Sequence, residues 1–340
     1  MINTATLLNQ LIAKQDLSHA QMHDIMRAIM TGELSPPLIA AFLVGLRCKG
    51  ESVTELAAAA EVMRSLSTKV PLAHLPHLVD TCGTGGDGAH TFNISTAAAF
   101  VTAAAGANVA KHGGRSVSST SGSADVLEAL GINVNLSPEQ VARCVQEIGI
   151  GFMFAPNHHS AMKHAAPVRR ELGVRTLFNL LGPMTNPANA PNQVMGVFAR
   201  ELTGKLAHVL QTLGSQHVMV VHAADGMDEL SLSGVSYIAE LCNGTVTEYE
   251  ITPEQFGLVR ASNAELAVAN LDTAKALLIA ALNNENRAAS DIVALNAGAA
   301  IYVAGIVPDL ASGVQLAQQQ ITSGAAMRKL DQLRELSLHV

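Results

Sequence analysis

Asp80-Thr-Cys-Gly-Thr-Gly-Gly-Asp-Gly88 is the stretch around which the rest of the chain can be interpreted. It follows the apolar pair Leu78-Val79 and holds four glycines in nine residues, and Thr91-Phe-Asn-Ile-Ser-Thr96 and an alanine-rich run to Ala105 come after it. This order is typical of a strand, a glycine-rich loop and the start of a helix. Because such a loop presents bare backbone N–H groups beside a helix N-terminus, it favours binding of an anion, usually a phosphate.

The spacing Gly83-x-Gly85-x-x-Gly88 also matches the dinucleotide-binding fingerprint, which needs an acidic residue about 20 positions later. No Asp or Glu occurs in the 37 residues from Gly88 to Ala124. The sequence therefore favours a ligand with several negative charges over a dinucleotide. An ordinary strand–helix turn stays as an alternative, although one tight turn needs fewer glycines.

A second cluster runs from Lys111 to Asp125 and holds three glycines, two cationic residues and five serines. It precedes an apolar helix start at Val126, so its hydroxyl and backbone N–H groups suit a second phosphate. Each serine taken alone is more typical of a turn or a cap.

A third cluster, Asp225-Gly-Met-Asp-Glu229, follows the apolar strand Val218–Val221. Adjacent carboxylates at a strand end suit Mg²⁺, which prefers oxygen ligands and keeps most of its waters. An ordinary acidic turn is the alternative.

The segment from Phe154 to Arg170 holds His158, His159 and His164. These histidines lack HExxH spacing, which argues against a zinc site. Arg169 could pair with a substrate carboxylate or lie on a helix surface. The sequence contains no GxSxG motif, and no cysteine has an identifiable activating base.

Composition narrows the class of protein. The 340 residues suggest about two domains, and 49% apolar against 14% charged residues indicates a large core. The net charge of −7 argues against a general nucleic-acid or acidic-membrane surface. Four separated cysteines suggest neither disulfides nor zinc, and the N-terminus has no signal-peptide pattern, so we expect a cytoplasmic protein without a membrane segment.

Periodicity predicts a small all-helical domain over 1–70 and an α/β domain over 71–340 with a mostly parallel sheet. We also expect a later segment around 165–190 to join the helical domain. Leu7, Leu8, Leu11 and Ile12 form one apolar stripe. Predicted strands are His77–Thr81, Asn108–Lys111, Ile150–Phe154, His217–His222, Tyr237–Leu241 and Thr245–Tyr249. Predicted helices include Ile94–Ala105, Ala124–Leu130, Pro138–Ile148, Thr203–Leu213 and a helical region from Leu271 to about Leu336. Asn179–Asn192, with three prolines, is predicted to be a structured loop or crossing between domains.

Together, Asp80–Gly88, Asn93–Thr96, Lys111–Gly131, Arg175–Pro187 and Asp225–Glu229 resemble the anthranilate phosphoribosyltransferase family, and the resemblance covers nearly the whole chain. It implies transfer of the phosphoribosyl group of phosphoribosyl pyrophosphate (PRPP) to the amine of anthranilate in tryptophan biosynthesis. It also implies a nucleoside-phosphorylase type of fold, Mg²⁺ with two ions per subunit, and a homodimer made through the helical domain.

The same resemblance implies roles for individual residues. The positions that match PRPP contacts are Gly83, Gly86, Asp87, Thr91, Asn93, Ile94, Ser95, Thr96, Lys111, His112, Gly113, Gly114, Arg115, Ser116, Val117, Ser118, Ser119 and Ser123. The positions that match anthranilate contacts are Gly83, Gly114, His159, Arg169 and Gly182, and those that match metal ligands are Ser95, Asp228 and Glu229. No covalent nucleophile is expected.

The chain departs from the family pattern at two positions. Gly114 stands where the family pattern Lys-His-Gly-Asn-Arg has an Asn that contacts anthranilate. The family also has His-Pro at the positions where this chain has His159-Ser160. A pyrimidine-nucleoside phosphorylase of the same architecture and a non-catalytic relative that binds nucleic acid remain as alternatives.

Overall fold

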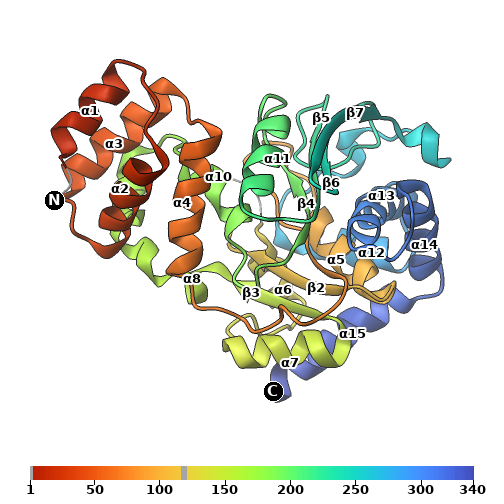
Figure 1. Cartoon of the computed structure of the whole chain (residues 1–340). Helices are drawn as coiled ribbons and strands as arrows, with labels where there is room; N and C mark the ends of the chain where they lie inside the picture. The colour runs from red at the N-terminus through yellow and green to blue at the C-terminus, as the bar shows by residue number, and fades with distance from the viewer. Residues whose placement is uncertain (1–2, 116–120) are drawn as a thin grey trace.

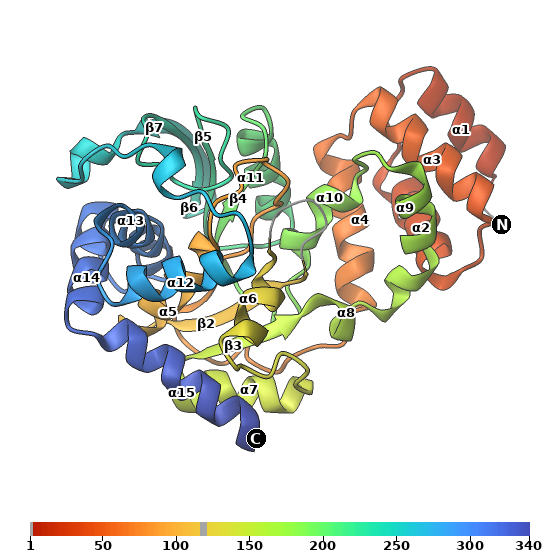
Figure 2. The same cartoon turned by 180° about the vertical axis from the view of Figure 1, so that it is seen from behind.

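The computed structural model describes residues 3–115 and 121–340 and has two lobes. In Figures 1 and 2 the first four helices form the smaller lobe, and a sheet covered by helices forms the larger one. The helices of the smaller lobe are α1 (Thr4–Ile12), α2 (His19–Thr31), α3 (Pro36–Lys49) and α4 (Val53–Ser65). Ser18 and Ser52 begin α2 and α4 with capping boxes, which satisfy backbone N–H groups at each helix start.

The larger lobe alternates strands and helices along the chain. Its strands are β1 (Leu78–Asp80), β2 (Asn108–Gly113), β3 (Ile150–Phe154), β4 (Asn192–Gly196), β5 (His217–Ala223), β6 (Ser236–Cys242) and β7 (Thr245–Ile251). Its helices up to β5 are α5 (Ile94–Ala104), α6 (Ser123–Ala129), α7 (Pro138–Ile148), α8 (Ala155–His158), η1 (Ser160–His164), α9 (Ala166–Leu172), α10 (Phe178–Leu181), η2 (Gly182–Thr185) and α11 (Leu202–Thr212). After β7 follow η3 (Pro253–Phe256), η4 (Asn263–Glu265), α12 (Leu271–Leu282), α13 (Arg287–Val303), α14 (Leu310–Thr322) and α15 (Ala325–His339).

The seven strands form one sheet in the order β3-β2-β1-β4-β5-β6-β7. The pairs from β3 to β5 are parallel, and β6 and β7 extend the sheet as an antiparallel edge. The chain runs outward from β1 through β2 to β3 and then returns to place β4 on the other side of β1. The carboxyl end of β1 is therefore the point where the strand order reverses, and ligands bind at such points in open α/β sheets.

Both faces of the sheet are buried except at the β7 edge, as β5 shows most clearly. Val218 and Val220 face a core shared with α11 and the smaller lobe, whereas Met219 and Val221 face the core that contains α5 and α13. Because side chains alternate along a strand, a strand buried on both faces is a nearly continuous apolar run, as His217–Ala223 is.

The predicted fold class is confirmed, with a helical N-terminal domain and a mostly parallel sheet. The first helical stripe was partly wrong, because Leu7 and Leu11 are buried but the Ile12 residue is 77% exposed. The sequence analysis also did not predict β4, which begins at Asn192, the last residue of the segment that was predicted to be a loop. Its first two residues are polar and their buried amides bond to backbone, Asn192 to the Leu78 carbonyl and Gln193 to the Pro183 carbonyl.

The core of the smaller lobe includes side chains from 165–184 as well as from α1 to α4. Met184 illustrates the connection, because its carbonyl accepts a 2.7 Å hydrogen bond from the Arg64 guanidinium at the end of α4. The division of the chain at residue 70 and the assignment of 165–190 to the helical domain stay predictions.

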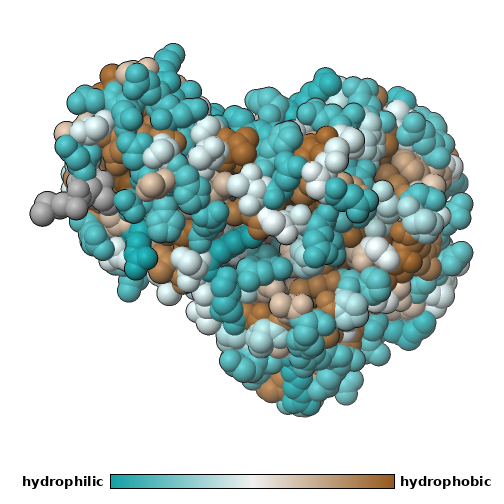
Figure 3. All heavy atoms as spheres, in the orientation of Figure 1, coloured by the Kyte–Doolittle hydropathy of each residue, from teal (hydrophilic) through white to brown (hydrophobic). Residues whose placement is uncertain are grey.

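The surface in Figure 3 is mostly polar on the face shown, with apolar side chains in small groups. Among the described residues, no helix is both long and apolar enough to cross a membrane. Cys48, Cys82, Cys144 and Cys242 are all free thiols.

Helices α13 and α14 pack against each other through two glycines. A Cβ at Gly298 would lie 2.6 Å from the backbone nitrogen of Val314, and one at Gly313 would lie 2.3 Å from the Gly298 carbonyl oxygen. The two backbones are therefore too close to admit a side chain at either position.

We predict that Gly298→Ala lowers the free energy of unfolding by about 1–3 kcal/mol, since the added methyl must push α14 away. The matched control is Gly45→Ala in α3, where the nearest atom to the new Cβ would be Leu11 Cδ1 at an ordinary 3.4 Å. The control should be neutral or stabilising by up to about 1 kcal/mol from helix propensity. Urea unfolding followed by circular dichroism measures both, and equal stabilities would contradict the close-packing interpretation.

Candidate active site

The glycine-rich loop leaves the carboxyl end of β1, where the strand order reverses. Gly85, Gly86 and Gly88 have φ angles of 64°, 78° and 75°, which favour glycine over other residues. A Cβ at Gly83 would lie 3.0 Å from Asp228 Oδ2 and 3.1 Å from the Gly196 carbonyl oxygen, so a side chain at this position would crowd both groups. The loop is tied to β4 by the Thr84 N–H, which donates to the Gly196 carbonyl at 2.9 Å.

Asp80 anchors the base of this loop. The residue is 1% exposed, and its carboxylate accepts hydrogen bonds from the backbone N–H of His112 at 3.1 Å and from Asn186 Nδ2 at 2.7 Å. Burial raises the pKa of Asp80 to about 6, and the Lys111 charge and these hydrogen bonds oppose the rise. Asn186 also donates to the Ala110 carbonyl at 2.9 Å, so one buried network joins β1, β2 and the segment that follows η2.

Helix α5 begins beside the loop and supplies its N-terminal N–H groups to the same site. Asn93 is the cap residue, and Ile94, Ser95 and Thr96 form the first turn. Ser95 N–H donates to Glu229 Oε1 at 3.2 Å, and Thr96 Oγ1 donates to Ser123 Oγ at 3.2 Å. The sequence clusters that contain α5, Ser123 and Glu229 therefore meet in space, at a helix terminus that favours anions.

Lys111 places a positive charge next to these groups. The residue is 3% exposed, and its Nζ donates to the Thr81 carbonyl at 2.6 Å and to Ser95 Oγ at 3.3 Å. Gly113, at the end of the same strand, would bring a Cβ within 3.1 Å of the Phe152 ring and 3.3 Å of Ser123 Cβ. The end of β2 is thereby held close to the start of α6.

Asp87, Asp228 and Glu229 bring three carboxylates together opposite Lys111. Asp228 Oδ2 accepts from the Gly85 N–H at 2.7 Å, and Asp87 Oδ2 accepts from the Asp228 N–H at 3.3 Å. Burial and then the Asp87 charge raise the pKa of Asp228, and burial and then the Asp228 charge raise the pKa of Glu229. Like charges held this close favour a divalent cation, and carboxylate and hydroxyl oxygens are the ligands that Mg²⁺ prefers.

A small cavity beside these groups is lined by Thr81, Gly83, Ser95, Ala98, Val194, Gly196, Glu229 and Asn296. A larger surface pocket between α11 and the β6–β7 edge has no residue in common with this site. The chemistry of the site is thus concentrated at the carboxyl end of β1 rather than in that larger pocket.

Comparison with known proteins identifies the family. The model of the glycosyl transferase family a/b domain matches residues 75–327, and that of the helical bundle domain of the same family matches 5–67. Anthranilate phosphoribosyltransferases from Laribacter hongkongensis and Thiobacillus denitrificans are 62% and 60% identical to this chain, over 99% and 98% of it and over 98% and 97% of their own lengths. This chain belongs to the anthranilate phosphoribosyltransferase family.

Solved structures of the anthranilate phosphoribosyltransferase family have the same fold. The enzyme from Thermus thermophilus is 43% identical and superposes with a TM-score of 0.91, covering 97% of this chain and 99% of its own. The Saccharomyces cerevisiae enzyme, in complex with PRPP and Mg, is 26% identical with a TM-score of 0.89, covering 99% of this chain and 98% of its own.

The positions that match anthranilate contacts in the family lie around the junction of the two lobes. The imidazole rings of His112 and His159 are 5.1 Å apart, and burial lowers the pKa of His159 to about 4. Arg169 lies on α9 with its guanidinium 5.2 Å from the centre of the Phe178 ring, and it forms no ion pair within the part of the chain that the structure describes. Burial lowers the pKa of Arg169. At Gly114 and Gly182, an added Cβ would meet no atom of the described residues within 4 Å.

Several predicted PRPP contacts have protein partners in this structure. Arg115 pairs with Asp125 at 2.9 Å and with both carboxylate oxygens of Glu128, and its guanidinium lies 5.4 Å from the centre of the Phe154 ring. Asn93 exchanges hydrogen bonds with Ser121, and Thr91 forms an isolated bridge with Ala267.

Four of the predicted positions, Ser116, Val117, Ser118 and Ser119, lie outside the described residues. The assignment of PRPP contacts stays a prediction at all the matching positions, described or not.

Sequence reasoning gave no role to three residues that shape the site. Arg175 donates to the Gly86 carbonyl and lies over the Phe198 ring, 4.0 Å from its centre, so it holds the glycine loop from outside. Asn186 supports Asp80. Asn296 on α13 accepts from the Leu230 N–H and donates to the Leu230 carbonyl, both at 2.9 Å, directly after Glu229. Asn296 is within an apolar helix with no local signal of this contact.

We predict that Asp228→Asn stabilises the metal-free protein at neutral pH and reduces its stabilisation by Mg²⁺. Because the pKa values of Asp228 and Glu229 are raised in the fold, their ionised forms weaken it as the pH rises through those values. A gain of about 1 kcal/mol would raise the melting temperature by roughly 1–2 °C in a chain of this length. Thermal melts in EDTA and in excess Mg²⁺ measure both effects.

The matched control is Asp225→Asn. Burial of Asp225 opposes ionisation, but the hydroxyls of Ser231 and Ser233 and the Met227 N–H lower its pKa, so its charge stabilises the fold. The control should melt at a lower temperature and retain the response to Mg²⁺. A destabilised Asp228→Asn variant with an unchanged Mg²⁺ response would contradict the assignment of the cation site.

Proposed function

We infer that this chain transfers the phosphoribosyl group of PRPP to the amine of anthranilate, giving N-(5-phosphoribosyl)anthranilate and pyrophosphate. This is the second step of tryptophan biosynthesis from chorismate. The observation that carries the inference is the meeting of two anion-binding elements with an acidic pair. The Gly85 N–H donates to Asp228 and the Ser95 N–H donates to Glu229, so the glycine loop and the start of α5 both contact the carboxylates. Family members 62% and 60% identical to this chain have this enzyme name.

Phosphate binding follows from the chain's own groups. The N–H groups of the loop around Gly83 and Gly86, and those of the first turn of α5, would hold the phosphates of PRPP, and the buried Lys111 ammonium would add positive charge. Ser95, Asp228 and Glu229 would hold Mg²⁺, which when bound neutralises charge on the departing pyrophosphate. Asp87 adds a third carboxylate, and bound PRPP would add the negative charge of its pyrophosphate. Together these charges exceed what Lys111 and one divalent ion balance, which supports two ions per subunit.

The acceptor is proposed to bind at the junction of the lobes. A half-buried guanidinium with no ion-pair partner in the described chain suits a carboxylate, so Arg169 would bind that of anthranilate. His159 is neutral at physiological pH because burial lowers its pKa to about 4, and Gly83, Gly114 and Gly182 would leave room for the aromatic ring. An aromatic amine is nucleophilic when neutral, so positioning and electrostatics would carry most of the rate.

The alternatives fit the observations less well. A pyrimidine-nucleoside phosphorylase would have no need for carboxylates that contact both anion-binding elements, and a nucleic-acid-binding relative should not have a net charge of −7.

Dimerisation through the helical domain is supported by the exposed apolar residues Ile12 in α1 and Val44 in α3. A reducing, cytoplasmic location is supported by the four free thiols.

The decisive experiment follows the loss of anthranilate fluorescence with PRPP, with and without Mg²⁺. We expect anthranilate to be consumed only when both PRPP and Mg²⁺ are present.

Replacing Asp228 and Glu229 together by Ala should lower kcat/KM by roughly a hundredfold or more, because the charge that develops in the transition state would lose its stabilisation. The matched control is Glu248→Ala with Glu250→Ala, two exposed carboxylates on β7. Undiminished turnover in the first variant, or phosphorolysis of uridine or thymidine by the wild type, would overturn the assignment.

Gly114 gives a separate prediction about the acceptor side. Because a Cβ there meets nothing within 4 Å in the parts of the chain that the structure describes, Gly114→Asn should fit and restore the amide that the family pattern has at this position. A new hydrogen bond of about 0.5–1.5 kcal/mol would lower the KM for anthranilate roughly two- to tenfold and leave the KM for PRPP unchanged. Gly114→Ala is the control, since it fills the space without adding an amide. Equal anthranilate KM values in the two variants would show that the contact is made elsewhere.

A further inference from the structure

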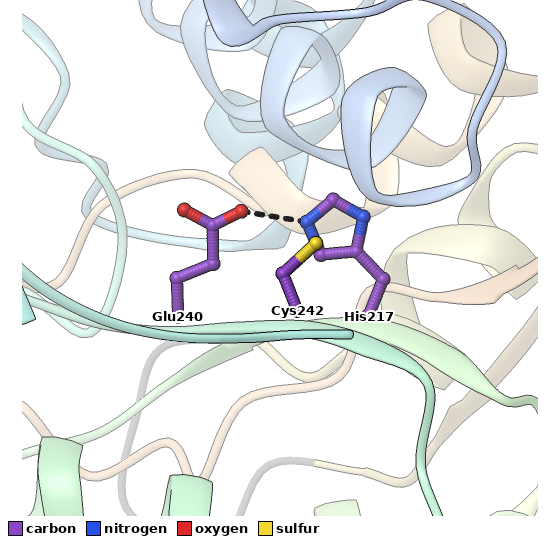
Figure 4. A group of neighbouring side chains, drawn as sticks. All are labelled: His217, Glu240 and Cys242. Carbon is purple, nitrogen blue, oxygen red and sulfur yellow. Dashed lines mark hydrogen bonds and ion pairs between the residues drawn. The ribbon is translucent and has the colours of Figure 1, made fainter. Parts of the chain in front are cut away.

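A second group of metal-ligating side chains lies on the larger lobe, away from the glycine loop. His217 is the first residue of β5, and Glu240 and Cys242 are near the end of β6. The antiparallel register places His217 directly opposite Cys242 and Met219 opposite Glu240. Since side chains alternate along strands, all three point to the same face of the sheet. Figure 4 shows them converging above the two strands.

The three ligand atoms are close, and the His217 and Glu240 side chains are largely shielded from water. The nitrogen, oxygen and sulfur atoms lie within 4.8 Å of one another, and His217 Nε2 is 2.6 Å from Glu240 Oε1. The His217 and Glu240 side chains are 15% and 10% exposed, and the Cys242 thiol is free. The distances already approach those of a coordination shell.

Neighbouring aromatic residues hold the acidic and imidazole members in place. Tyr249 Oη donates to Glu240 Oε2 at 2.7 Å, and the Tyr302 ring contacts His217 edge to face with 4.7 Å between centres. Such outer partners fix the orientation of metal ligands. Tyr302 belongs to α13 and Tyr249 to β7, so the group is enclosed by two further elements.

We propose that His217, Glu240 and Cys242 form a binding site for a thiophilic divalent cation, Zn²⁺, with water as the fourth ligand. The set of one nitrogen, one oxygen and one sulfur atom suits Zn²⁺ and disfavours Mg²⁺ and Ca²⁺, which take oxygen ligands. Ligand atoms about 2.0–2.3 Å from one ion lie roughly 3–4 Å apart, so the His217–Glu240 pair must open by only about 1 Å.

Binding would exchange protons for the cation. The ion would replace the proton shared by His217 Nε2 and Glu240 Oε1, and the Cys242 thiol would lose its proton to become a thiolate ligand, with both protons released to water. Burial, and then the nearby Glu240 charge, raise the pKa of Cys242, so the thiol is protonated without metal. The bound ion would join the first residue of β5 to the end of β6.

This site is separate from the PRPP site. His217 lies at the amino end of β5, whereas Asp228 and Glu229 follow its carboxyl end at Ala223. Seven residues of strand span about 23 Å, so a cation at one end does not coordinate the carboxylates at the other. Ligands at the two ends can therefore be tested independently.

The test uses Co²⁺ as a spectroscopic probe and Zn²⁺ as competitor, on the full chain with excess Mg²⁺ present. We expect one equivalent of Co²⁺ to produce a thiolate-to-cobalt charge-transfer band that one equivalent of Zn²⁺ abolishes. Zn²⁺ should also raise the melting temperature by several degrees. No band with the wild type would overturn the proposal and leave the His217–Glu240 contact as a buried ion pair only.

Variants locate the ion. Cys242→Ser and His217→Gln should both lose the band, and circular dichroism and gel filtration check that each is folded. The matched control is Cys48→Ser, which changes an exposed thiol outside the group and should retain the band. Asp228→Ala with Glu229→Ala should also retain it. A band that survives in folded Cys242→Ser, or disappears in Cys48→Ser, would contradict the assignment.

Discussion

The buried carboxylate of Asp80 is the interaction on which the site depends. It lies at the end of β1, between the two halves of the sheet, and its bonds to the His112 N–H and to Asn186 join β1, β2 and the segment that leads back from the smaller lobe. A buried acid without partners would be costly, so these donors must be in place when the strands pack. Once they are, the glycine loop, the start of α5 and the end of β2 have little freedom to lie elsewhere.

The site concentrates charge of both signs that the protein alone does not fully balance. Lys111 faces three acidic groups near the loop, whereas Arg169 on the other lobe has no ion-pair partner among the described residues. Unbalanced charges of this kind destabilise the unliganded protein, and binding of a ligand with the opposite charge stabilises it, which is common at functional sites. The proposed substrates bring the opposite charges to each place: a metal-bound pyrophosphate to the acids and a carboxylate to the guanidinium.

The sequence allowed the fold class to be predicted because its signals are local: apolar stripes such as Leu7 and Leu11, glycines around Gly85, and apolar runs such as β5. It did not allow β4 to be predicted, because Asn192 and Gln193 are polar yet buried through hydrogen bonds to distant backbone. The acidic pair was found from adjacency in the chain, but its contacts with Gly85 and Ser95 join segments more than a hundred residues apart. Nor could composition show that Arg115 pairs with Asp125 and Glu128.

Asn296 has a consequence for motion. Its side chain closes hydrogen bonds with both the N–H and the carbonyl of Leu230, so the acidic segment is fastened to the interior of α13. Opening that segment would break two buried hydrogen bonds at once, so its amide hydrogens should exchange with solvent almost as slowly as those of the core. The contacts of the glycine loop, by contrast, include exposed ones such as the hydrogen bond from Arg175 to the Gly86 carbonyl. The acidic wall of the site is therefore fastened more firmly to the core than the glycine loop that contacts it.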